Sequence, residues 1–168
     1  MKKFVFIDES IRTQYTIAAV IVPISKVAEY RKEMAQLRAK GARTFHMGKE
    51  RRQRQDAAVR TLARLGYCEL VSATSSSPVQ AVARQECLRT LVSYLPGGEY
   101  HLVLDRTNQD SKDRDTILRL RFESRRALDF VHLERSHDPG LWGADIVAWF
   151  SGRSRMPKLE IKQLSSHA

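Results

Sequence analysis

Short apolar runs alternate along the chain with longer segments in which apolar residues recur at helical spacing. The first run, Phe4–Ile7, ends in Asp8 and Glu9. It shows no alternation with polar residues, which indicates a strand covered on both faces. A second run, YTIAAVIV over residues 15–22, follows the short segment SIRTQ. Such a short connection favours an antiparallel hairpin.

Beyond this hairpin the pattern predicts helices that alternate with strands. We expect helices over 26–39, 49–65, 79–94, 113–122 and 138–151, and strands over 68–74, 100–105 and 129–135; RTFHM (43–47) is either a short strand or extended chain. This order predicts an α/β fold, with a mixed central sheet (an antiparallel first hairpin, then parallel strands) flanked by helices on both faces. We expect one domain over residues 1–151 and a basic, weakly structured tail over residues 152–168.

Three aspartates stand out against this pattern. Asp8 and Asp105 each end an apolar strand, and ligands commonly bind beyond the carboxyl ends of parallel strands. Asp105 lies near Asp8 only if strand 100–105, rather than strand 68–74, neighbours the first strand. Otherwise it is an ordinary turn residue.

Asp145 lies within GLWGADIVAWF, on the same helical stripe as Leu141 and Ala148. Its carboxylate is therefore expected to face the interior. A buried charge is costly unless it is paired or bound to a cation, so the alternatives are a metal ligand or a buried salt bridge.

His46 precedes the helix expected over 49–65, and Glu50 lies in its first turn. Glu50 lies at the edge of the apolar face, where it either points toward the end of the sheet or is solvated in the first turn. His46 is four residues earlier, and Gly48 argues against a helix that includes both. We therefore expect His46 to contact substrate or to lie behind the ligands.

Several carboxylates that converge without bases repel one another unless divalent cations lie between them. Oxygen-only ligands favour Mg²⁺ or Mn²⁺ over Zn²⁺. A pair of such ions can activate water and stabilise the leaving oxygen of a phosphodiester. The predicted catalytic and metal-binding residues are Asp8, Glu50, Asp105 and Asp145, with His46 as a further catalytic candidate.

The net charge of +10 changes the picture, because 29 Lys and Arg face only 19 Asp and Glu. Such an excess indicates a polyanionic partner, of which nucleic acid is the commonest. Basic residues flank Glu50. We expect four of them to bind a phosphate backbone, namely Lys49, Arg51, Arg52 and Arg54. A merely solvated helix face is the alternative.

Cellular location follows from the cysteines and the apolar runs. Cys68 and Cys87 lack metal-binding spacing and are expected to be reduced thiols. The longest apolar run, Ile17–Ile24, is far too short to span a bilayer. With no recognisable signal segment at the N-terminus, we expect a cytoplasmic protein without membrane contact.

Five segments of the chain together show a family resemblance: FVFIDES, YTIAAVIVP, TFHMGKERRQRQ, HLVLD and RSHDPGLWGADIVAWF. They resemble the domain-of-unknown-function family 3800, which is grouped with ribonuclease-H-like folds. The resemblance covers roughly residues 3–151. It implies that Asp8, Glu50, Asp105 and Asp145 form an acidic metal-binding cluster of the ribonuclease H type. It also implies that Glu9, His46, His132 and Asp138 lie near this cluster, and Ser10, next to Glu9, is a further candidate for a supporting role.

Two functions remain open on the sequence. The first is a metal-dependent nuclease in which Asp8 and Asp145 hold the metals and His46 or His132 protonates the leaving group. The second is an inactive ribonuclease-H-like module that binds nucleic acid or protein in a defence, toxin or mobile-element system. Neither the choice among DNA, RNA and hybrid nor the oligomeric state follows from the sequence.

Overall fold

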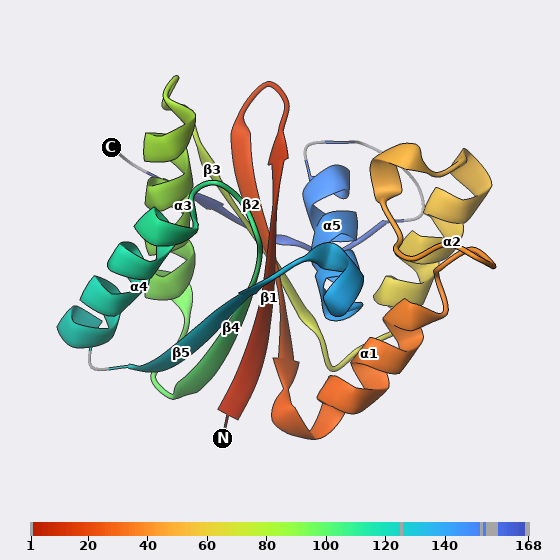
Figure 1. Ribbon diagram of the computed structural model, residues 1–168, viewed down its shortest axis with the longest axis horizontal. Helices are drawn as coiled ribbons and strands as arrows, with labels where there is room; N and C mark the ends of the chain where they lie inside the picture. Colours follow the sequence, from red (N-terminus) through yellow and green to blue (C-terminus); the bar gives the residue numbers. More distant parts are fainter. Residues whose placement is uncertain (1, 125, 152, 154–157, 167–168) are drawn as a thin grey trace.

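A six-stranded mixed sheet forms the centre of the protein, and helices cover both of its faces (Figure 1). The computed structural model describes residues 2–124, 126–151, 153 and 158–166. The strands are β1 (Lys2–Ile11), β2 (Tyr15–Pro23), β3 (Glu69–Ser75), β4 (Glu99–Asp105), β5 (Ala127–Leu133) and β6 (Lys162–Ser165). The α-helices are α1 (Val27–Ala35), α2 (Arg52–Ala63), α3 (Gln80–Tyr94), α4 (Asp110–Ser124) and α5 (Gly140–Phe150).

The strand order is β5-β4-β1-β2-β3-β6. β2 is antiparallel to its neighbours β1 and β3, and the other neighbouring pairs are parallel. The expected α/β class, mixed sheet and antiparallel first hairpin are therefore confirmed. Because both β4 and β2 flank β1, the ends of β1 and β4 lie side by side, which brings Asp105 next to Asp8.

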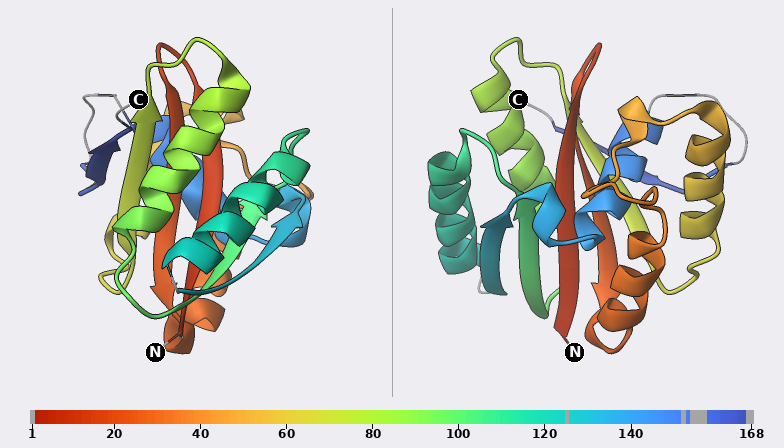
Figure 2. Two further views of the ribbon diagram at one scale, coloured as in Figure 1. Left: turned by 90° about the vertical axis from the view of Figure 1, so that its left-hand side faces the viewer. Right: turned by 45° about the vertical axis from the view of Figure 1, so that its right-hand side comes forward.

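The two faces of the sheet are covered by different helices (Figure 2). α5 packs directly on β1 and β2, and α1 and α2 lie against α5 on this face. α3 and α4 cover the opposite face, with α3 on β2 and β3 and α4 on β5. Along β1, Phe6 enters the first core and Ile7 the second, which explains why the strand shows no polar alternation.

Some expected bounds shift in the structure. α1 ends at Ala35 instead of 39, and of the two alternatives for residues 43–47 the strand is excluded. α2 begins at Arg52, so the expected helix start at 49 is wrong. A 3-10 turn over Met47–Lys49 precedes it, and Glu50 has an extended backbone with φ −89° and ψ 152°. Glu50 consequently lies outside the helix that was expected to orient it.

The segment expected to be a weakly structured tail contributes β6, which pairs in parallel with β3 over Val71–Thr74. Its basic composition obscured an apolar pattern, in which Leu159 and Ile161 pack on one core and Leu164 on the other. Pairing with β6 also satisfies backbone groups that an edge strand would leave open. Residues 152 and 154–157 of this segment lie outside the described residues.

Candidate functional site: an acidic centre closed by an arginine

Asp8 lies at the carboxyl end of β1 and is buried beneath α5. Its Oδ1 accepts a hydrogen bond from the backbone N–H of Glu9 at 2.8 Å. Its Oδ2 accepts one from Nη2 of Arg135 at 3.0 Å. Burial raises the pKa of Asp8 well above its usual 3.8; Arg135 opposes this, and the charges of Asp145 and Asp105 add to it. Asp8 is thus held where a negative charge is unfavourable without more positive charge nearby.

Asp145 reaches the same centre from α5, a helix whose residues are almost all buried. Its Oδ2 accepts a hydrogen bond from the backbone N–H of Met47 at 2.7 Å. This bond ties the loop before α2 to α5. The same oxygen lies 3.3 Å from Nη1 of Arg135. The buried carboxylate is therefore oriented by one neutral donor and one cation.

Arg135 lies between the acids, in the short 3-10 turn that links β5 to α5. Its Nη2 also lies 3.4 Å from Oδ2 of Asp105, so one guanidinium faces carboxylates from β1, β4 and α5. Burial lowers the pKa of Arg135, but the charges of Asp8, Asp145 and Asp105 outweigh burial and raise it. Trp142 Nε1 donates to the Arg135 carbonyl at 3.0 Å, which anchors the turn.

Sequence reasoning did not identify Arg135. Its only signal was the need of buried acids for a cation, together with an arginine just before the helix that carries Asp145. Nη1 is buried and makes no hydrogen bond among the described residues, although Asp145 lies within ion-pair distance. The guanidinium is therefore held between the acids more by charge attraction than by hydrogen bonds of ideal geometry.

Glu9 points to the opposite face of the sheet from Asp8. There it accepts a hydrogen bond from Nη1 of the buried Arg84 at 2.7 Å and another from the hydroxyl of Tyr15. Arg84 also makes two bonds to Asp113 of α4, at 2.9 and 2.8 Å. Glu9 therefore belongs to a network that joins β1, α3 and α4.

His132 lies on that second face too, with Nε2 3.0 Å from Oδ2 of Asp113. Among the described residues, Asp110, Asp113 and His132 form a set whose potential ligand atoms all lie within 4.8 Å of one another. Asp113 is already bonded twice by Arg84 and once by Gln85 Nε2 at 2.9 Å. Its oxygens therefore take part in a structural hydrogen-bond network and are less available to a metal ion.

The remaining expected residues lie at the margin of the acidic centre or away from it. Glu50 pairs with Arg54, whose Nε lies 2.7 Å from its Oε2. His46 Nδ1 accepts from Gly48 N at 3.2 Å and lies 3.9 Å from Oδ2 of Asp145. His46 is thus at the rim of the centre, whereas Glu50 is turned toward α2.

Asp138 and Ser10 have other roles in the structure. Asp138 is buried, pairs with Arg31 at 2.7 and 3.1 Å, and accepts from the backbone N–H of Gly140 at 2.8 Å. It therefore holds the start of α5 against α1. Ser10 lies on the same face as Asp8, two residues farther along β1, and lines a polar cleft.

The expected nucleic-acid-binding residues divide into free and engaged side chains. Lys49, Arg51 and Arg52 are exposed. Arg54 is half-buried, because besides its pair with Glu50 it donates from Nη2 to the carbonyl of Leu37 at 2.6 Å. Arg52 lies 4.0 Å from Asp56 but keeps 75% of its side-chain surface exposed. The first three are available to a polyanion.

Comparisons with known proteins leave the family open. No protein-family model matches the chain, and a search of curated proteins found no relative. Across the described residues, none of the helices has the length and apolar character needed to cross a membrane. The function proposed below is therefore argued from the fold and from the geometry of the site.

Proposed function

We propose that the protein is a divalent-metal-dependent nuclease of the ribonuclease-H-like kind, with Asp8, Asp105 and Asp145 as its metal-binding carboxylates. One observation carries the proposal. Three acids from three separate elements converge on a single guanidinium, so the centre holds one positive charge against three potential negative charges. Such an arrangement is under-neutralised and has an affinity for further cations.

The donor set suits Mg²⁺ or Mn²⁺, because it consists of carboxylate oxygens. Asp8 and Asp105 lie at the carboxyl ends of the parallel strands β1 and β4, and Asp145 comes from α5. A bound divalent cation would supply the charge that activates water and stabilises the leaving oxygen of a phosphodiester. The backbone N–H groups of Glu9 and Met47 orient Asp8 and Asp145 for this role. In this proposal His46, at the rim of the centre, delivers a proton to the leaving group.

The second candidate is a catalytically inactive module of the same fold that binds nucleic acid or protein. The contact of Arg135 with all three acids favours it, because an internal cation can substitute for a metal ion. The two candidates differ in whether a divalent cation can compete with Arg135.

Calorimetric titration with Mn²⁺ separates them when it is applied to the wild type and two variants. As a nuclease, the wild type binds Mn²⁺ at about millimolar concentration or tighter, and Asp145→Asn abolishes binding. Arg135→Gln tightens binding, because it removes the competing cation. Arg135→Gln also lowers the melting temperature without metal, and Mn²⁺ restores it by binding the folded state.

Arg60→Gln is the matched control, since Arg60 is exposed on α2 away from the acids. Its Mn²⁺ affinity is expected to equal that of the wild type. Single- and double-stranded DNA, RNA and hybrid substrates are then incubated with Mn²⁺, and the nuclease cleaves at least one of them. Folded wild type and Arg135→Gln that both fail to bind Mn²⁺ establish the inactive module instead.

A further inference from the structure

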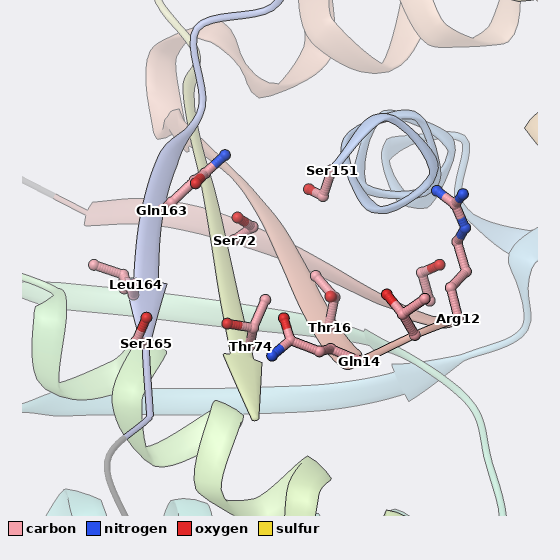
Figure 3. Close-up of a pocket in the computed structure, with 11 residues that line it drawn as sticks. Arg12, Gln14, Thr16, Ser72, Thr74, Ser151, Gln163, Leu164 and Ser165 are labelled. Carbon is pink, nitrogen blue, oxygen red and sulfur yellow. The ribbon is translucent and has the colours of Figure 1, made fainter. Parts of the chain in front are cut away.

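A polar cleft lies beside the acidic centre on the same face of the sheet. It has a volume of about 420 Å³ and is lined by β1, β2, β3, β6, the β1–β2 turn and the end of α5 (Figure 3). Its lining is dominated by hydroxyl and amide side chains, and the described residues that line it include no carboxylate and no aromatic ring. Its chemistry therefore differs from that of the acidic centre.

The floor of the cleft is a row of hydroxyls in register across four neighbouring strands. Ser10 of β1 is opposite Thr16 of β2, Thr16 is opposite Thr74 of β3, and Thr74 is opposite Ser165 of β6. With strands about 4.8 Å apart, this row spans about 14 Å. The hydroxyls thus form a continuous track across the sheet.

This track is the direct continuation of the surface that carries Asp8. Asp8 is in the next row back along β1, about 7 Å from the hydroxyl row. The row that contains Asp8 continues through Ala18 of β2 to Ser72 of β3 and Gln163 of β6. A molecule that occupies the acidic centre can therefore extend directly onto the hydroxyl floor.

The change from apolar to polar floor coincides with the end of α5. One row earlier, Phe6, Val20 and Leu70 are apolar and belong to the core beneath the helices. α5 ends at Phe150, and Ser151 lines the cleft.

Within the described residues, the side chains of Thr16 and Thr74 make no hydrogen bond. Their hydroxyls are therefore available to a ligand.

The charge of the lining suits an anion. Among the described residues that line the cleft, the charged side chain is that of Arg12, which is exposed in the β1–β2 turn. Nε of Arg153 donates to the carbonyl of Trp149 at 2.6 Å, which offsets the negative end of α5. Arginine, Ser/Thr hydroxyls and glutamine amides are the side chains that commonly contact phosphate and sugar.

We propose that this cleft binds the sugar–phosphate backbone of one nucleic-acid strand as it leaves the acidic centre. The proposal rests on the proposed nuclease function and adds the path of the substrate. Because the described part of the lining offers no aromatic side chain for base stacking, recognition comes from the backbone and is independent of sequence. Arg12 contacts a phosphate, and the hydroxyl row contacts sugar and phosphate oxygens.

The test measures binding of labelled single-stranded DNA and RNA oligonucleotides by fluorescence anisotropy, with EDTA present so that neither metal binding nor cleavage contributes. The double variant Thr16→Val and Thr74→Val removes two hydroxyls while keeping side-chain shape and strand propensity. It is expected to weaken binding about tenfold or more, at every salt concentration. Thr61→Val is the control, because the exposed Thr61 hydroxyl bonds only to its own helix at Ala57.

Arg12→Gln gives a second, independent readout. Loss of one phosphate contact reduces the slope of log K against log salt by about 0.7 for a single strand. The threonine variants leave this slope unchanged, because they remove no charge. Both variants alter exposed or cleft-facing side chains, and circular dichroism checks that they fold.

Binding that is unchanged in both folded variants overturns the cleft proposal. Because EDTA is present, this outcome is independent of the metal titration. Loss of affinity in the cleft variants combined with no Mn²⁺ binding supports the cleft and refutes only the nuclease. An equal loss in Thr61→Val also overturns the proposal, because it shows an effect unrelated to the cleft.

Discussion

At the scale of single residues, the adjacent acids Asp8 and Glu9 take part in different structures. Successive side chains of a strand point to opposite faces, so Asp8 enters the centre beneath α5 and Glu9 the network beneath α3 and α4. A hydrogen bond from the backbone N–H of Glu9 to Oδ1 of Asp8 links the centre and the network. The network behind β1 thus holds the strand end that positions the acidic centre.

Asp113→Asn tests this network. The substitution leaves the fully buried Arg84 short of negative charge, so we expect the free energy of unfolding to fall by about 3–5 kcal/mol. Urea denaturation measures it, with Asp115→Asn, an exposed residue of the same helix, as the control expected within about 0.5 kcal/mol of wild type. A loss below about 1 kcal/mol would contradict a supporting role.

The same residue predicts a pH dependence. Burial would raise the pKa of Asp113, but hydrogen bonds from His132 and Arg84 outweigh burial and lower it below 3.8. Its stabilising contribution is therefore present above the unfolded value of 3.8 and is lost as the pH falls through the lower folded value. The wild type should lose this increment in acid, whereas Asp113→Asn should not.

At the scale of elements, α5 determines the geometry of the site. It carries Asp145, follows the turn that holds Arg135, and lies close to both the sheet and α1. The close approach depends on two glycines. A Cβ added at Gly140 would lie 2.3 Å from Cε1 of Phe6, and one at Gly143 would lie 2.0 Å from the hydroxyl of Tyr30. The Tyr30 hydroxyl donates to the carbonyl of Gly140 at 2.6 Å, which fixes α5 on α1.

Gly143→Ala is therefore expected to destabilise the protein by about 1–3 kcal/mol, although alanine favours a helix by about 1 kcal/mol over glycine. Thermal unfolding measures the change. Gly66→Ala is the matched control, because a Cβ there meets nothing within 4 Å and the backbone imposes no positive φ. It should leave stability unchanged or slightly higher. A neutral Gly143→Ala would show that α5 can move away from α1 without cost.

At the scale of the whole molecule, a net charge of +10 surrounds a centre rich in carboxylates. The exposed residues Lys49, Arg51 and Arg52 lie near the loop that Asp145 holds through Met47. In the proposed nuclease, a polyanion that binds these basic side chains lies next to the acidic centre.

The double variant Arg51→Gln and Arg52→Gln should weaken binding to all nucleic-acid sequences about equally. Its salt slope should fall by about 1.4 for single strands, or about 1.8 for duplexes, if both side chains contact phosphate. Anisotropy titrations at several salt concentrations measure this. Arg119→Gln with Arg121→Gln removes the same charge from α4 on the opposite face, and an equal effect there would refute a localised interface.

The sequence by itself determined the α/β class, the first hairpin and most elements, because apolar periodicity reports directly which positions face a core. It also marked Asp8 and Asp145, since acids within apolar segments stand out whatever the fold. β6 escaped notice because Leu164 is its one apolar residue, and the apolar residues just before it, Leu159 and Ile161, pack on the other core. Glu50 was misplaced because the start of α2 depends on the preceding turn.

Only the tertiary structure decided which strand neighbours β1, and therefore that Asp105 joins Asp8 while Glu9 and His132 lie on the other face. It also decided that Arg135 lies among the acids and that hydroxyls from four strands align in one row. The physical reason is that strand pairing and helix docking join residues distant in the chain. Local periodicity reports which face a residue occupies, but not which other residues share that face with it.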